Sequence, residues 1–428
     1  MHKYQFETLS LHAGAVVDET NSRALPMHRT TAYVFRDTKH AADLFALKEL
    51  GNIYSRLTEP TTAALEQRMA TLEGGKAAVA VSSGTAAIHY AIVNVAKMGD
   101  EIVASKNLYG GTYTMFDAIL PDYGITTNFV DINNFDEVRS AINNKTRAIY
   151  TEVIGNPTLD VANIKGVSKI AKEFNLPLIV DATFNTPYHF RPIEHGADVV
   201  VHSLSKWIGG HGTAIGGIVI DAGNFDWSDV KFSLYNEPDA SYHGLRYAYD
   251  LGDLNNVAFA MRLRLVPLRN LGSCMSPDNA WIFMQGLETL SLRMRRHSEN
   301  ALQVAKWLQT QEEVSWVRYP GLKADAGYRN AKNQLERGFG GMVVFGIKGG
   351  VDSGSRFIDA LNLISHVANV GDAKSLAIHP ASTTHSQLSA EQQLASGVGE
   401  DLIRLSIGIE HINDIINDIE QALVRSKA

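Results

Sequence analysis

The sequence predicts an α/β fold: a mostly parallel seven-stranded sheet with helices on both faces, followed by a smaller C-terminal α+β domain. Three observations lead to this prediction. Short apolar runs alternate with helical stretches between residues 63 and 220. Several runs hold consecutive β-branched residues, as in Val199–Val201, which suits strands covered on both faces. From about residue 271 the pattern changes to long helices with few strands.

The large sheet is expected to contain seven strands. In chain order they are AAVAV, DEIVAS, TTNFVD, RAIYTEV, LPLIVD, ADVVVHS and GGIVID. The stretch TAALEQRMATLEGG has a helical apolar period and stops at two glycines, and helical segments such as NNFDEVRSAINN and NIKGVSKIAKEFN separate most of the strands. Strands that alternate with helices form βαβ units, and therefore a mostly parallel sheet.

The chain divides into three parts. Residues 1–62 are irregular and polar and are expected to form an N-terminal arm, while residues 63–270 form the large domain. Residues 271–428 form the C-terminal α+β domain, with a long helical run, strand candidates at GMVVFGI and LIRLSIG, and a closing helix at HINDIINDIEQALVRS.

Composition excludes several classes of protein. A chain of 428 residues that is 45% hydrophobic can bury a large core. The net charge of −7 and the lack of a basic block argue against a nucleic-acid surface. With Cys274 as the only cysteine and scattered histidines, we expect no disulfide and no metal site. No apolar stretch approaches a membrane span and no signal-peptide pattern begins the sequence, so we expect a cytoplasmic enzyme.

Two turns contain groups that could bind phosphate. A predicted strand ends at Ser83, Gly84 and Thr85, and a helix begins immediately. Free amides at a helix start bind anions, although such residues often serve only as helix caps. Ser203 and Ser205 follow a later strand. Their hydroxyls could bind phosphate oxygens or could take part only in ordinary turn chemistry.

Lys206 and Asp181 are expected at the same edge of the sheet. Lys206 follows the strand VVVHS and Asp181 ends the strand LPLIVD, and open α/β sheets bind ligands at the carboxyl ends of their strands. Taken singly, they could be a solvated lysine and a helix-capping aspartate. Together they suit pyridoxal phosphate (PLP), whose aldehyde bonds to a lysine amine and whose ring nitrogen an acid keeps protonated.

Seven motifs together resemble the Cys/Met-metabolism family of PLP enzymes of fold type I, the aspartate-aminotransferase-like fold. They are NIYSRLTEPTTAALEQRMATLEGG, SSGTAA, NLYGGTY, EVIGNPT, VDATFNTP, HSLSKWIGGHG and LIRLSIGIE, which occur in the right order over nearly the whole chain. Within the family, GDAKSLAIHPASTTH and the long insert from YHGLRYAYDLG to PDNAWIFMQGLETLSLRM look like those of O-acetylhomoserine sulfhydrylases.

The resemblance implies roles for individual residues. Lys206 forms the Schiff base and shuttles protons, and with Tyr109, which stacks on the cofactor ring, it makes up the catalytic pair. Asp181 pairs with the ring nitrogen. Arg404 grips the substrate carboxylate as a two-pronged fork, helped by the Ser375 backbone.

The other implied contacts hold the cofactor and the substrate. Tyr54 and Arg56 match residues that reach the phosphate across a subunit interface, so residues 1–62 would contribute to the neighbouring subunit's site and the chain would form a tetramer of two dimers. Asn156 would lie near the ring's phenolic oxygen. Both Asn156 and Tyr54 would lie near the substrate. The full set of implied cofactor contacts is Tyr54, Arg56, Ser83, Gly84, Thr85, Tyr109, Asn156, Asp181, Thr183, Ser203, Ser205 and Lys206.

The implied reaction is γ-replacement in methionine biosynthesis. Acetate leaves O-acetyl-L-homoserine, a sulfur nucleophile adds at Cγ, and L-homocysteine is released. Lys374 stands where lyases and cystathionine γ-synthases usually have an acidic residue, which discourages substrates that carry an amino group at that point. The sulfur donor stays open among sulfide, methanethiol and sulfur on a carrier protein, and so does the choice between acetyl and succinyl esters.

Three alternatives remain. A methionine γ-lyase would share the early steps and release ketobutyrate, but its usual cysteine after YGGT is absent here. A cystathionine γ-synthase would use cysteine as the nucleophile. A non-catalytic binding protein with the same fold is a third possibility, against which the intact Lys206, Asp181 and Arg404 weigh.

Overall fold

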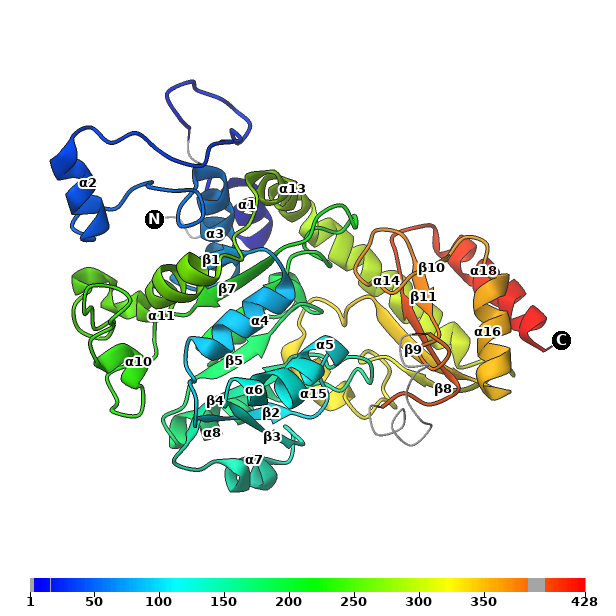
Figure 1. Ribbon diagram of the computed structural model, residues 1–428. Coiled ribbons are helices and arrows are strands. Elements are labelled where there is room, and N and C mark those ends of the chain that lie inside the picture. The colour runs from blue at the N-terminus through cyan, green and yellow to red at the C-terminus, as the bar shows by residue number, and fades with distance from the viewer. Residues whose placement is uncertain (1–3, 16, 384–396, 428) are drawn as a thin grey trace.

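The computed structural model describes residues 4–15, 17–383 and 397–427. The last two residues of the GDAKSLAIHPASTTH motif, Thr384 and His385, therefore lie outside the described residues. The chain forms a seven-stranded sheet and a five-stranded sheet, which lie next to one another with helices around each (Figure 1). In the described ranges, no helix is long and apolar enough to cross a membrane.

The seven-stranded sheet contains every strand predicted for it. Its strands are β1 (Ala77–Val81), β2 (Glu101–Ser105), β3 (Thr126–Val130), β4 (Thr146–Glu152), β5 (Leu178–Asp181), β6 (Val199–Ser203) and β7 (Gly217–Asp221). Their order is β1-β7-β6-β5-β4-β2-β3. Strand β7 runs antiparallel to both of its neighbours and the other pairs are parallel. The predicted fold class is confirmed.

Both faces of this sheet are buried, as the β-branched runs predict. Val199 and Val201 belong to the hydrophobic cluster that includes α4 (Gly84–Val93), whereas Val200 belongs to the cluster on the other face, which includes α3 (Pro60–Glu73). Successive side chains of a strand point to opposite faces. Each fully buried valine contributes roughly 1.5 kcal/mol or more through removal of apolar surface from water, so a run of valines suits this position.

The remaining helices of residues 63–270 connect these strands or cover the sheet. They are α5 (Gly110–Thr114), α6 (Leu120–Asp122), α7 (Phe135–Ala141), α8 (Ile164–Glu173), α9 (Thr186–His189), α10 (Ser233–Asn236), α11 (Ala258–Leu263) and α12 (Arg269–Leu271). The predicted helices NNFDEVRSAINN and NIKGVSKIAKEFN correspond to α7 and α8. Each begins at an asparagine whose side chain accepts a backbone N–H of the first turn.

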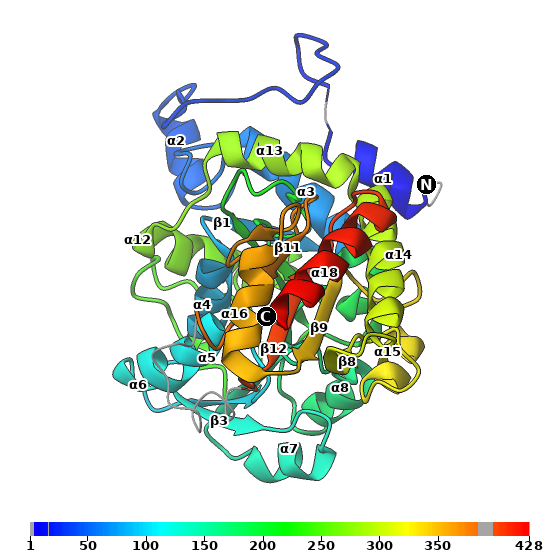
Figure 2. The same cartoon turned by 90° about the vertical axis from the view of Figure 1, so that its right-hand side faces the viewer.

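The five-stranded sheet has the order β10-β11-β12-β9-β8. The helices and strands of this C-terminal part are α13 (Pro277–Glu288), α14 (Leu290–Leu308), β8 (Val314–Arg318), α15 (Tyr328–Gln334), β9 (Met342–Ile347), α16 (Gly350–Ala360), β10 (Ser365–His366), β11 (Leu376–Ile378), β12 (Leu402–Ser406) and α18 (Ile412–Ser426). Figure 2 shows α16 and α18 side by side over this sheet. The sequence predicts one long helical run from residue 277, but the structure has two helices, α13 and α14, that meet at Thr289. Strands β8, β10 and β11 were not predicted.

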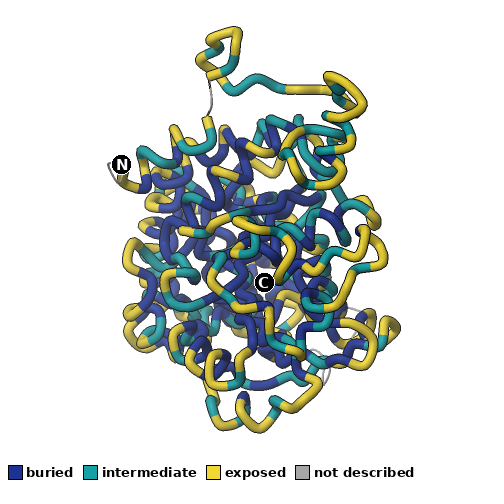
Figure 3. Tube along the Cα trace, turned by 90° about the vertical axis from the view of Figure 1, so that its left-hand side faces the viewer, coloured by how far each residue is buried: buried dark blue, intermediate teal, exposed yellow. Residues whose placement is uncertain are grey.

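The described part of residues 1–62 is only partly irregular. Helix α1 (Phe6–His12) packs on the body of the protein, with Phe6 buried edge-on against Tyr188. After it, the chain leaves the body in a long excursion that includes α2 (Thr38–Phe45), and much of this excursion is exposed (Figures 1 and 3). Val34 in this excursion is 97% exposed. The domain boundaries proposed from the sequence, near residues 63 and 271, stay predictions.

Candidate active site

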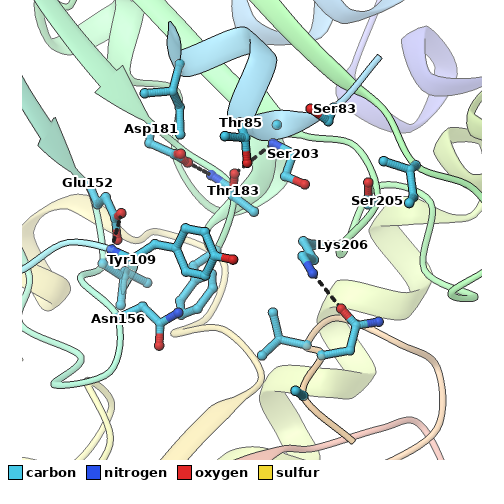
Figure 4. Close-up of a pocket in the computed structure, with 18 of the residues that line it drawn as sticks. Ser83, Thr85, Tyr109, Glu152, Asn156, Asp181, Thr183, Ser203, Ser205 and Lys206 are labelled. Atoms are coloured by element: carbon cyan, nitrogen blue, oxygen red, sulfur yellow. Dashed lines mark hydrogen bonds between the residues drawn. The ribbon is translucent and has the colours of Figure 1, made fainter. Parts of the chain in front are cut away.

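A cavity of about 250 Å³ lies at the carboxyl ends of β4, β5 and β6. Side chains of the large sheet and of the C-terminal part both line it, so the two parts of the chain meet here (Figure 4). The residues predicted from the sequence that line this cavity are Ser83, Gly84, Thr85, Tyr109, Asn156, Asp181, Thr183, Ser203, Ser205, Lys206 and Arg404.

One end of the cavity is built to receive an anion. Ser83 caps α4, and its Oγ accepts the Ala86 N–H at 3.0 Å, while the first amides of the helix have no intrahelical acceptor. Gly84 packs so closely on Ser203 that a Cβ at this position would lie 2.5 Å from the Ser203 Cβ. The close approach brings the helix start and the Ser203 hydroxyl together, and both offer hydrogen-bond donors to an oxyanion.

Asp181 provides a largely buried carboxylate to the lining of the same cavity. It ends β5, and one of its oxygens accepts the Thr183 N–H at 2.8 Å. Burial raises the pKa of Asp181, and the hydrogen bonds from Thr183 oppose this effect. A buried carboxylate is stabilised by a cationic N–H partner, so this position suits a protonated ring nitrogen.

Lys206 emerges from the loop after β6 and points into the cavity (Figure 4). Its Nζ donates to Asn369 Oδ1 at 2.6 Å. Burial lowers the pKa of Lys206, and the nearby Arg404 guanidinium lowers it further. Both effects favour the neutral amine, which is the form that attacks an aldehyde.

Arg404 reaches the cavity from β12, in the C-terminal sheet. Its Nη1 donates to Asn156 Oδ1 at 3.1 Å, and burial lowers its pKa to about 10. None of the ion pairs found among the described residues involves this guanidinium. A buried guanidinium without a carboxylate partner is suited to a substrate carboxylate, which it can bind through two parallel hydrogen bonds.

Three of the predicted site residues, and also Lys374, do not line this cavity. Tyr54 is 41% exposed and stacks with Arg56, whose guanidinium carbon lies 5.0 Å from the centre of the Tyr54 ring. Ser375 is fully buried elsewhere, and its N–H donates to Glu410 Oε1 at 2.6 Å. Lys374, used above to argue for specificity, is exposed and also lies outside the cavity lining.

Sequence reasoning missed Asn369 and Glu152. Asn369 lies in a loop more than 160 residues after Lys206, so no local pattern connects them. Glu152 ends β4 just as Asp181 ends β5, and the two are register partners. The argument that found Asp181 would therefore also have found Glu152. Burial and the neighbouring Asp181 raise the pKa of Glu152 well above its usual range.

Known proteins similar to this chain share its full length. The family model for Cys/Met metabolism PLP-dependent enzymes matches residues 7–424. An O-acetyl-L-homoserine sulfhydrylase of Leptospira meyeri is 53% identical over 97% of this chain and 96% of its own length. A homocysteine synthase of Schizosaccharomyces pombe is 48% identical over 98% of each chain.

A solved structure agrees with these relatives. It is a Campylobacter jejuni protein described as an O-acetylhomoserine (thiol)-lyase, with a TM-score of 0.94 and 40% identity over 98% of this chain and 100% of that one. That protein carries a pyridoxyl-lysine phosphate at its position 205.

The cavity residues fit PLP on their own chemistry. The start of α4 with the Ser203 hydroxyl offers donors for a phosphate, and the Ser205 hydroxyl, which here donates to the Gly216 carbonyl at 3.3 Å, lines the same cavity. Asp181 offers a carboxylate for the ring nitrogen, and Lys206 offers an amine whose pKa is lowered. The cofactor is therefore PLP, and the chain belongs to the Cys/Met metabolism family of PLP-dependent enzymes.

Proposed function

We propose that the protein replaces the γ-acetoxy group of O-acetyl-L-homoserine with sulfur, giving L-homocysteine and acetate. The observation that carries the proposal is the joint lining of one cavity by Lys206, Asp181 and Arg404, which come from distant parts of the chain. Full-length similarity to an O-acetyl-L-homoserine sulfhydrylase and to a homocysteine synthase supports this substrate.

Arg404 and the cofactor contacts would position the substrate. Arg404 binds the α-carboxylate through its free N–H groups, which fixes Cα relative to Lys206. Asp181 holds the proton on the ring nitrogen, and the α4 start with the Ser203 and Ser205 hydroxyls holds the phosphate. PLP, when bound, supplies an electron sink for the pair left at Cα after proton removal.

Lys206 would move the protons. Its lowered pKa favours the neutral amine, which can accept the Cα proton, and general-base catalysis of this kind contributes about 10²–10⁴ in rate. Once Lys206 has given up this proton, its neutral amine removes a second proton from Cβ, which allows acetate to depart from Cγ. The sulfur nucleophile then adds at Cγ, and Lys206 returns protons to Cβ and Cα. Tyr109 lies across the cavity from Lys206 (Figure 4), where it would stack on the ring.

A homo-oligomer would complete the site. Tyr54 and Arg56 belong to the exposed excursion of residues 17–59 and lie outside this subunit's cavity. We place them in the cavity of a neighbouring subunit, near the phosphate, within a tetramer built from two dimers. The exposed apolar side chains of the excursion, such as Val34 and Leu50, support its burial against a second copy.

The sulfur donor and the location of the enzyme stay predictions. Sulfide, methanethiol and sulfur on a carrier protein remain the candidate donors, and the expected compartment is the cytoplasm. The exposed position of Lys374 gives no support to the specificity argument made from its charge.

A product assay tests the proposal. Purified protein with PLP and O-acetyl-L-homoserine is incubated with and without sulfide, and products are measured by mass spectrometry. Homocysteine that forms only with sulfide is the expected result. Ketobutyrate at a similar rate in both samples would identify a lyase instead, and no turnover with intact cofactor binding would favour a binding protein.

A further inference from the structure

Glu152 is a buried carboxyl group that the mechanism above does not use. It is 7% exposed and ends β4 in register with Asp181. Its Oε1 accepts the Tyr109 N–H at 2.7 Å (Figure 4). The Asn156 N–H lies close enough to this carboxyl group to lower its pKa. One side chain therefore connects the backbones of two loops, and each loop carries a residue that would contact the cofactor ring.

The Tyr109 N–H has the Glu152 carboxyl group as its acceptor, while the residues before it are held by the buried Leu108 and by Asn107, whose side chain donates to Asp160 at 2.9 Å. Tyr109 occupies the N-cap position of α5 without a side-chain cap, and its side chain is 51% exposed. Two glycines, Gly110 and Gly111, follow it directly, and glycines leave the backbone free to adopt other conformations.

A second cavity lies on the other side of Glu152. It measures about 220 Å³, and Glu152 lines both it and the first cavity. Glu152 therefore forms part of the wall between the two cavities.

We propose that Glu152 is a positioning residue for the cofactor ring, which it serves by fixing the Tyr109 and Asn156 backbones on either side of one carboxyl group. This inference rests on the placement of Tyr109 and Asn156 beside the ring in the proposed function. It predicts that loss of the carboxyl group weakens PLP binding and changes the environment of the ring, beyond any loss of stability.

Asp221 offers a matched control. It ends β7, is 3% exposed, and accepts the backbone N–H groups of Gly223 at 2.8 Å and Ala260 at 3.0 Å. Because β7 is antiparallel, Asp221 pairs with Val199 at the start of β6, at the sheet edge opposite the cavity. Its loss removes a similar buried carboxyl group without touching the site.

The test compares Glu152→Ala with Asp221→Ala. Each apo-protein is titrated with PLP to measure the dissociation constant, and the holoenzymes are compared by visible absorption maximum, kcat, KM and thermal midpoint. Because the Tyr109 N–H loses its acceptor, Glu152→Ala is expected to weaken PLP binding about 10-fold or more, to shift the absorption maximum and to lower kcat more than it raises KM. Asp221→Ala is expected to lower the thermal midpoint alone.

Glu152→Gln supplies the rescue. Its amide oxygen can still accept the Tyr109 N–H, so PLP affinity is expected between those of Glu152→Ala and the wild type. If Glu152→Ala does not fold, Glu152→Met replaces it, because methionine fills a similar volume without a carboxyl acceptor, and wild-type PLP affinity and absorption in Glu152→Met overturn the inference. The inference also fails if both alanine variants lose stability alone.

Tyr109→Ala separates this inference from the proposed function. If Tyr109→Ala changes the absorption maximum and Glu152→Ala does not, the role of Glu152 is wrong and the placement of Tyr109 stands. If neither variant changes it, Tyr109 does not contact the ring, and the inference about Glu152 is overturned with it.

Discussion

Replacement of Arg404 by lysine tests the substrate-binding role most sharply. Arg404 already gives one N–H to Asn156 at 3.1 Å, and its remaining donors can form two parallel hydrogen bonds to the substrate carboxylate. Lysine keeps the charge but replaces the planar fork with a point charge. Loss of one charge-assisted hydrogen bond costs about 1.5–3 kcal/mol, so KM for O-acetylhomoserine should rise about 10- to 100-fold. The value of kcat should change much less, because binding is lost equally in ground and transition states.

Steady-state kinetics with varied O-acetylhomoserine at saturating sulfide measures the effect. Arg147→Lys is the control, since Arg147 is also a partly buried arginine and pairs with Asp100 at 2.8 Å near the opposite edge of the sheet. It should leave KM unchanged. A wild-type KM in Arg404→Lys, with the fold intact, would refute the reasoning that this guanidinium binds the carboxylate.

Three further predictions concern protons. Lys206→Ala should abolish the visible band of the covalently bound cofactor and lower kcat by about 10² or more, as spectroscopy and kinetics of the variant will show; a retained band contradicts this. Arg404→Gln removes the cation that helps to lower the pKa of Lys206, so this pKa should rise. The acidic limb of the kcat–pH profile should then move to higher pH, and an unmoved limb would mean that the two charges do not interact. Burial lowers the pKa of His297 to about 4, so below its unfolded value of about 6.5 only the unfolded chain binds the proton. The free energy of unfolding should therefore fall by about 1.4 kcal/mol for each unit by which pH is lowered between these values. Denaturant titrations at pH 7 and pH 5 should show a smaller loss of this free energy in His297→Gln than in the wild type, and equal losses would contradict the prediction.

The strands of the large sheet could be predicted because each is a short apolar run in a regular alternation. Val199–Val201 is buried on both faces, and such a run suits a strand in a sheet that is covered on both faces. The C-terminal sheet was harder to predict. Strand β8 is partly exposed and β11 has three residues within a loop, so neither has enough length or periodicity to be recognised. The break at Thr289 was missed because apolar periodicity continues on both sides of it.

The candidate site was predictable to the extent that its residues end strands or form family motifs. Asp181 and Lys206 follow buried strands directly, so their shared edge is a consequence of parallel topology. Asn369 is a different case, because only the packing of the C-terminal part against the large sheet brings it to Lys206. Tyr54 and Arg56 depend on a second chain in the proposed assembly, and the fold of one subunit cannot bring them to its own cavity.

The central claim is that γ-replacement proceeds through proton removal at Cα and Cβ by Lys206. The most direct measurement runs the reaction with O-acetylhomoserine and sulfide in D₂O and locates deuterium in the homocysteine by NMR and mass spectrometry. The account predicts deuterium at Cα and at one Cβ position, since Lys206 exchanges its protons with solvent. Homocysteine without deuterium at either carbon would mean direct displacement of acetate by sulfide, and the account would be wrong.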